Sequence, residues 1–262
     1  MRIQEKNLIV VNFKMYLPDK SASNRWMKNF EKAFSGLELA NTRLALCPSS
    51  IYLSEFAEKL KSEYIDIGGQ DCFWQDEGAF TGGLGAKMIF SCGGRFVILG
   101  HSERRKYFAE TDQQIAYKTK QALINRLHPI LCIGENAEEK RQEKTKEVIL
   151  GKLEKCLQFV GKGSLEEIVI CYEPIWAISA NNPEHPPEAN EIMEARVLIK
   201  RFLVKKYGQS VADRVKIIYG GSVDSKNYKE VCSDSGMEGA LIGSAGKMPY
   251  ELAKVVKVAQ EN

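Results

Sequence analysis

Short runs of aliphatic and β-branched residues recur along the chain and predict eight strands. Most of these runs are almost continuously apolar, which is typical of strands buried on both faces of a parallel sheet. They cover residues 8–13, 42–47, 64–68, 95–99, 129–133, 168–172, 215–219 and 239–243. Apolar stripes at helical spacing separate them and predict helices that pack against the sheet.

The regular alternation of these segments predicts the fold. Strand starts are on average roughly 33 residues apart, about the length of one βαβ unit. Eight such units in about 250 residues fit a closed (β/α)8 barrel, and an open, doubly wound sheet is the structural alternative. No Pro- or Ser-rich linker interrupts the pattern, so we expect one domain over residues 1–262. The charged run 138–146 predicts the exposed face of a single helix.

Composition narrows the possible partners and the compartment. Lys and Arg total 37 against 34 Asp and Glu, a formal net charge of +3. Without a basic stripe, this balance argues against a dedicated nucleic-acid binder. The seven cysteines are scattered, with no C-x-x-C pair, which suits a reducing compartment. No apolar run is long enough to cross a membrane, and the N-terminal residues do not resemble a signal peptide. We therefore expect a cytoplasmic protein.

Polar residues that could take part in catalysis or binding follow the predicted strands. In parallel α/β folds, active sites form where strands end. Lys14 follows the first strand, His101 the fourth and Glu173 the sixth, and glycines and serines follow the seventh and eighth. Such glycine-rich turns can hold a phosphate through backbone N–H groups. An isolated histidine is more often structural, but together these groups suggest proton transfer on a small phosphorylated carbonyl compound.

Other chemistries lack their sequence signatures. There is no H-x-x-x-H or H-E-x-x-H pair and no cysteine pair with ligand spacing, so no metal is expected. The chain has no G-x-S-x-G nucleophile motif and no dinucleotide fingerprint. The turn ending in Lys247 is not a phosphate-binding P-loop, because Leu241 occupies the first glycine position and Met248 follows the lysine. We expect no cofactor.

Six motifs in order make the chain resemble the triosephosphate isomerase family over almost its whole length. They are Val11-Asn12-Phe13-Lys14-Met15, Gly78-Ala79-Phe80-Thr81-Gly82, Gly100-His101-Ser102-Glu103-Arg104-Arg105, Cys132-Ile133-Gly134-Glu135, Tyr172-Glu173-Pro174-Ile175-Trp176-Ala177-Ile178 and Tyr219-Gly220-Gly221-Ser222. The resemblance implies a TIM barrel that interconverts dihydroxyacetone phosphate and glyceraldehyde 3-phosphate, without a cofactor, in glycolysis and gluconeogenesis.

The same resemblance implies roles for individual residues. Glu173 would be the base that moves a proton between two adjacent carbons. His101, in its neutral form, would donate a hydrogen bond to the enediolate oxygens and shuttle a proton between them. Lys14 would supply positive charge near the substrate oxygen and phosphate, with Glu103 holding Lys14. Asn12 would help to orient the oxyanion.

Phosphate binding and a lid are implied in the same way. Backbone N–H groups of Ser179, Ser222, Gly243 and Ser244 would hold the phosphate. Trp176 would anchor a mobile lid after the base, and Cys132 would support the site. Residues 179–184 read Ser-Ala-Asn-Asn-Pro-Glu where the family usually has Gly-Thr-Gly-Lys-Thr-Ala. This departure leaves two alternatives open: a longer ketose or aldose phosphate as substrate, and a barrel that binds a ligand or partner without catalysis.

The resemblance also implies a homodimer. The loop from Gly78 to Gly82 would enter the partner subunit, where Thr81 would support the active site. Gly83 stands where the family usually has an acid, so an ion pair with Arg104 across the interface is expected to be missing. For Arg105 we expect an ordinary ion pair on the surface.

Overall fold

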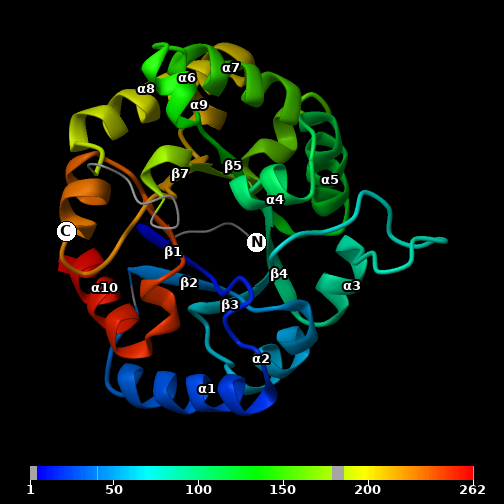
Figure 1. Ribbon diagram of the computed structural model, residues 1–262, viewed down its shortest axis with the longest axis vertical. Helices are drawn as coiled ribbons and strands as arrows, with labels where there is room; N and C mark the ends of the chain where they lie inside the picture. Colours follow the sequence, from blue (N-terminus) through cyan, green and yellow to red (C-terminus); the bar gives the residue numbers. More distant parts are fainter. Residues whose placement is uncertain (1–4, 40, 179–185, 262) are drawn as a thin grey trace.

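The computed structural model describes residues 5–39, 41–178 and 186–261. The eight expected strands form a closed barrel in which every neighbouring pair is parallel and β8 pairs with β1. Helices surround this barrel on its outside (Figure 1). The (β/α)8 barrel is thereby confirmed, and the open sheet is excluded.

Each strand lies within one residue of its predicted bounds. The strands are β1 (Asn7–Asn12), β2 (Thr42–Cys47), β3 (Ile65–Gly69), β4 (Gly94–Leu99), β5 (His128–Ile133), β6 (Val169–Tyr172), β7 (Lys216–Tyr219) and β8 (Gly239–Ile242). The agreement arises because strands buried on both faces are largely apolar, and polar residues or glycines mark most of their ends.

The helices follow the apolar stripes. They are α1 (Lys20–Phe34), α2 (Leu53–Lys59), α3 (Ala86–Ser91), α4 (Ser102–Tyr107), α5 (Asp112–Ile124), α6 (Ala137–Arg141), α7 (Thr145–Cys156), α8 (Ala189–Tyr207), α9 (Gln209–Ala212) and α10 (Pro249–Glu261). None of the helices described is both long and apolar enough to cross a membrane.

The single helix expected over residues 138–146 is wrong. The structure has two helices there, because α6 ends at Arg141 and α7 begins at Thr145. Between them Glu143 has a φ of 55°. This left-handed conformation cannot continue a right-handed helix, so the backbone breaks at this point.

Two apolar layers hold the barrel together. Alternate strand residues such as Ile9 and Val11 point outward and pack against the helices. The others fill the barrel interior: Leu8, Val10, Ala45, Cys47, Phe96, Ile98, Ile130, Cys132, Val169, Cys171, Ile218 and Leu241. Because side chains close the middle of the barrel, a ligand can be bound only at a rim.

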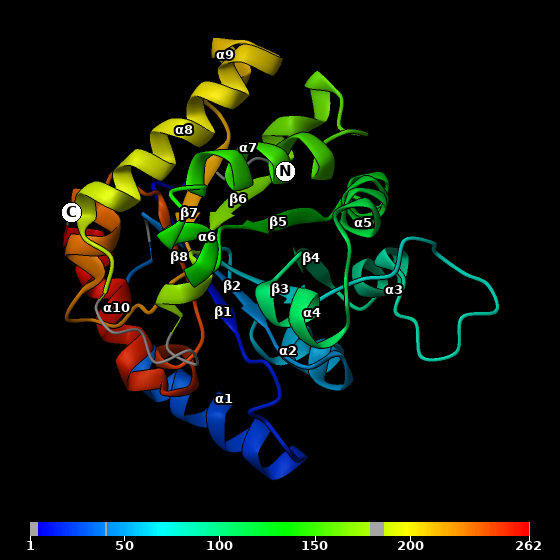
Figure 2. The same cartoon turned by 45° about the horizontal axis from the view of Figure 1, so that its top comes forward.

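Loops at the carboxyl ends of the strands form that rim. All eight strands run in the same direction, so the segments after β1, β4 and β6 meet there although they are far apart in sequence. One loop differs from the rest. The chain between β3 and α3 extends away from the barrel in both views (Figures 1 and 2).

Candidate active site

A cavity of about 540 Å³ opens at the carboxyl-terminal rim of the barrel. Its lining combines the loops after β1, β4, β6, β7 and β8. Six of the residues predicted for the site line this one cavity: Lys14, His101, Glu173, Ser222, Gly243 and Ser244. The cavity therefore gathers an ammonium, an imidazole and a carboxylate beside the two glycine- and serine-containing turns.

His101 is held as the N-cap residue of α4. Gly100, with a φ of 70°, turns the chain after β4. The Nδ1 atom of His101 accepts the backbone N–H of Glu103 at 3.2 Å. Because a backbone N–H can only donate, Nδ1 carries no proton, and the ring proton lies on Nε2. Nε2 is 3.0 Å from Oε1 of Glu173, close enough to donate to that carboxylate.

The Glu173 carboxylate is buried and hydrogen-bonded on both oxygens. Only 2% of the residue is exposed. The backbone N–H of Ser102 donates to Oε2 at 3.0 Å, and the Ser102 hydroxyl donates to Oε1 at 3.1 Å. A buried carboxylate needs such donors to offset its lost hydration. Ser102 was not among the predicted site residues, although its place in the first turn of α4, directly after His101, was a signal.

Lys14 adopts a strained backbone conformation that several groups fix. Its φ is 48°, which lies in a region that residues other than glycine rarely occupy. The Asn12 side chain accepts the Lys14 backbone N–H at 3.0 Å, and Gln70 donates to the Lys14 carbonyl at 3.0 Å. The ammonium lies 2.7 Å from a carboxylate oxygen of Glu103. Asn12 itself is buried and is not among the residues that line the cavity.

The turns after β7 and β8 are pressed onto the barrel. A Cβ at Gly220 would lie 2.6 Å from the sulfur of Cys171, so only glycine fits there. The carbonyl of Gly246 accepts the indole N–H of Trp26 at 3.1 Å, which fixes the turn after β8. The backbone N–H of Ser222 lies 3.3 Å from the carbonyl of Ala177.

The remaining phosphate-binding prediction lies outside the described residues. Ser179 and the departure from the family sequence at 179–184 both fall in the segment 179–185. The residues that line the cavity lie before and after this segment in the sequence.

Comparison with known proteins gives the family. The chain matches a family model described as Triosephosphate isomerase over residues 7–259. The chain belongs to the triosephosphate isomerase family.

Full-length relatives agree with this assignment. A protein of Dictyoglomus turgidum named Triosephosphate isomerase is 37% identical over 254 residues, which cover 96% of this chain and 99% of the relative. A protein of Thermoanaerobacter sp. with the same name is 34% identical over 249 residues, covering 95% and 98%. One of Carboxydothermus hydrogenoformans is 37% identical over 254 residues, covering 96% and 98%.

In this triosephosphate isomerase family member, Trp176 and Cys132 are not among the residues that line the cavity. The Trp176 indole N–H donates to Glu135 at 2.9 Å, and Tyr172 donates its hydroxyl to the same carboxylate at 3.2 Å. Glu135 is fully buried and was not predicted as a site residue. A hydrogen bond with Cys171, together with burial, raises the pKa of the Cys132 thiol well above its ordinary value. The thiol therefore stays protonated and acts through packing.

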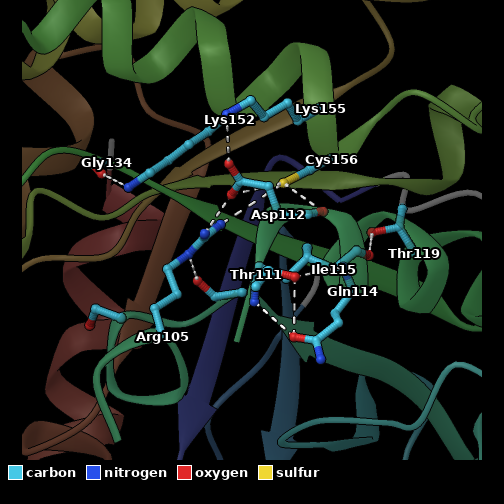
Figure 3. A network of polar contacts seen from close by, with 12 residues as sticks. Arg105, Thr111, Asp112, Gln114, Ile115, Thr119, Gly134, Lys152, Lys155 and Cys156 are labelled. Atoms are coloured by element: carbon cyan, nitrogen blue, oxygen red, sulfur yellow. Dashed lines mark hydrogen bonds and ion pairs between the residues drawn. The ribbon is translucent and has the colours of Figure 1, made fainter. Parts of the chain in front are cut away.

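The ion pair expected for Arg105 is present, but it is only partly exposed. The Arg105 guanidinium pairs with Asp112 at 2.6 Å, and the two side chains are 16% and 20% exposed (Figure 3). The Nε of Arg105 also donates to the carbonyl of Gly100 at 2.8 Å. Arg105 lies on α4 and folds back toward the strand end, which the charged sequence around it did not indicate.

No metal centre is evident in the part of the chain that the structure describes. There, no three His, Cys, Asp or Glu side chains are grouped so that they could hold an ion.

Proposed function

We propose that this protein interconverts dihydroxyacetone phosphate and D-glyceraldehyde 3-phosphate through an enediolate, as a step of glycolysis and gluconeogenesis. The observation that carries the proposal is the convergence of Lys14, His101 and Glu173 on one cavity. Family membership and relatives named Triosephosphate isomerase support it. The chemistry requires no cofactor, because one base and one hydrogen-bond donor can carry out the proton transfers.

Glu173 and His101 divide these transfers. Glu173 takes a proton from the carbon next to the carbonyl, and the electron pair of that C–H bond forms the enediolate double bond. His101 donates its Nε2 proton to the carbonyl oxygen and recovers one from the neighbouring hydroxyl. Glu173 then returns its proton to the other carbon, so atoms and charge balance. To reach the substrate, the Glu173 carboxylate must give up its two hydrogen bonds with Ser102 and move next to the substrate carbon.

Lys14 and the turns bind the charged parts of the substrate. The Lys14 ammonium stabilises negative charge on the enediolate and the phosphate. Asn12 positions the Lys14 backbone, because its side-chain oxygen is already bound there. We propose that Ser222, Gly243 and Ser244 hold the phosphate with Ser179, and that Ser222 gives up its Ala177 partner to do so.

A coupled assay tests this activity. Dihydroxyacetone phosphate formed from glyceraldehyde 3-phosphate is reduced by glycerol-phosphate dehydrogenase while NADH absorbance is followed. Turnover well above the enzyme-free rate is expected, and a rate equal to background would reject the proposal. A higher kcat/KM for four-carbon than for three-carbon phosphates would favour the longer substrate. Calorimetric binding of glycerol 3-phosphate without turnover would favour a silent barrel.

We further propose that two copies of the chain associate through the loop from Gly78 to Gly82. The chain between β3 and α3, which contains this loop, extends from the barrel (Figure 2), and Phe80 is 39% exposed. A second cavity of about 660 Å³, lined partly by Phe73 and Trp74, lies beside it and could accept the same loop of a partner. Sedimentation equilibrium should give twice the mass of the chain, and Phe80→Asp should lower it to that of the monomer.

The interface does not depend on an acid at position 83. Arg104 lies 2.9 Å from Asp71 of its own chain, so its charge is compensated without a partner residue. A surface-type ion pair contributes only about 0–1 kcal/mol in any case. The proposed location is the cytoplasm, which is supported by seven cysteines that are all free.

A further inference from the structure

Two cations bind backbone carbonyls directly beside the two proton-transfer residues. Arg105 donates to the carbonyl of Gly100, the residue before His101. Lys152, on α7, donates to the carbonyl of Gly134 in the loop after β5 (Figure 3). The Arg105 contact is local in sequence, whereas Lys152 reaches Gly134 from the outer layer of helices. Lys152 is therefore the group whose position needs an explanation.

Gly134 is in contact with the backbone of Glu173. A Cβ at Gly134 would lie 1.9 Å from the Glu173 carbonyl oxygen. On either side of this contact, Glu173 N–H donates to Ile133 at 2.7 Å and Ile175 N–H donates to Glu135 at 2.9 Å. Ile133, the last residue of β5, and the two residues after it thus contact the segment that carries the carboxylate. A displacement of Gly134 must displace Glu173.

The ammonium of Lys152 occupies an unfavourable environment. Its residue is half-buried, and in the described part of the chain it forms no ion pair. Burial lowers its pKa, and the nearby charge of Arg105 lowers it further. Lys155, three residues later on the same helix, keeps its side chain 67% exposed. Two lysines of one helix thus lie in different environments.

The surrounding network is complete without Lys152. Asp112 pairs with Arg105 at 2.6 Å and lies 3.7 Å from the ammonium of Lys155. The thiol of Cys156 also contacts Asp112, at 3.7 Å (Figure 3). Arg105 is thus neutralised and held by Asp112, and the only hydrogen bond of the Lys152 ammonium in this network is the one to Gly134.

We propose that Lys152 is a positioning residue for the base of the reaction. By binding the Gly134 carbonyl, it sets the depth at which the loop after β5 holds the Glu173 backbone. It contacts neither substrate nor reacting atoms. This inference rests on the proposed function, because it assigns Lys152 to the proton transfer by Glu173. It follows that Lys152 affects the enediolate-forming step and leaves phosphate binding unchanged.

Lys152→Met tests the proposal, with Lys155→Met as the matched control on the same helix. We expect kcat of K152M to fall about 5- to 20-fold, the scale of a sub-ångström misplacement of a reacting group, with KM changed less than twofold. Affinity for a hydroxamate that mimics the enediolate and carries the same phosphate should fall by the same factor. Affinity for glycerol 3-phosphate should not change. K155M should match the wild type in all four measurements.

An unchanged kcat in folded K152M would overturn the proposal. Equal losses of affinity for the hydroxamate and glycerol 3-phosphate would also overturn it, because a general structural effect would explain them. If K152M does not fold, Lys152→Gln is measured in the same way, and an unchanged kcat again refutes the role. Wild-type turnover is measured first. A wild type without turnover rejects the proposed function itself, independently of any variant.

Discussion

The backbone N–H of Glu103 donates to Nδ1 of His101 across 3.2 Å. This contact places the ring proton on Nε2. His128 offers a built-in comparison, because its Nδ1 lies 3.1 Å from the carbonyl of Glu167, which can only accept. Burial lowers the pKa of His128, so its neutral form is available for comparison above neutral pH.

We therefore predict opposite tautomers for the two rings. Long-range ¹H–¹⁵N spectra at pH 8 should show an unprotonated Nδ1 in neutral His101 and an unprotonated Nε2 in His128. Replacing His101 by Gln identifies its signals. A neutral His101 protonated on Nδ1 would contradict the geometry of the α4 N-terminus and remove the donor from the cavity.

Glu173→Gln should abolish most of the proton transfer while leaving the cavity intact. The amide keeps the shape of the side chain but cannot accept a proton from carbon, and loss of a general base costs at least about 10²-fold. We expect kcat to fall by at least that factor with little change in KM. Exchange of substrate C–H for solvent deuterium should slow by a similar factor, and undiminished exchange would remove Glu173 from this role.

Gly134→Ala should impair catalysis through sterics alone. The new methyl group would lie 1.9 Å from the Glu173 carbonyl oxygen, so one backbone must move. We expect a loss of about 1–3 kcal/mol of unfolding free energy, typical of overpacking, and a fall in kcat of at least about tenfold. Denaturant unfolding and the coupled assay measure the two effects.

Gly151→Ala is the matched control for that substitution. Nothing lies within 4 Å of a Cβ at Gly151, which is inside α7. Alanine should therefore stabilise the helix by up to about 1 kcal/mol and leave kcat unchanged. If both alanine variants lost the same stability and activity, the close contact of Gly134 with Glu173 would not explain the losses in Gly134→Ala.

The stability of K152M relative to the wild type should depend on pH. Because the folded-state pKa of Lys152 is lowered, the unfolded chain holds a proton that the folded chain has lost between that lowered pKa and about 10.4. Stability contributed by Lys152 therefore rises with pH in that window and is smallest at neutral pH. Urea unfolding of both proteins at pH 7.5 and pH 10 measures this. The free energy of unfolding of the wild type, relative to that of K152M, should be higher at pH 10 than at pH 7.5. A lower value at pH 10 would contradict the lowered pKa of Lys152.

The sequence predicts the barrel well because its physical causes are local. β5 is apolar over all its residues after His128, and Gly134, Glu135 and Asn136 follow it. The break between α6 and α7 could not be predicted in this way, since Glu143 takes up its left-handed φ in the middle of a charged run. Nothing in that run distinguishes this position from its neighbours.

The candidate site divides in the same way. Lys14, His101 and Glu173 could be predicted, because strand ends in a parallel barrel converge on one rim. Arg105 and Lys152 could not, because their roles depend on contacts between the helix layer and loop carbonyls. A lysine inside an amphipathic helix has the same sequence signature whether it faces water or a backbone oxygen.

The left-handed backbone of Lys14 has a consequence for laboratory evolution. A library screened only for heat tolerance should enrich glycine or asparagine at codon 14, because both relax the φ of 48°. Such variants would lack the ammonium to which we assign substrate binding. Selection for thermal stability thus favours glycine or asparagine at position 14, whereas selection for turnover favours lysine. Lys14 should therefore be kept unchanged in such a library.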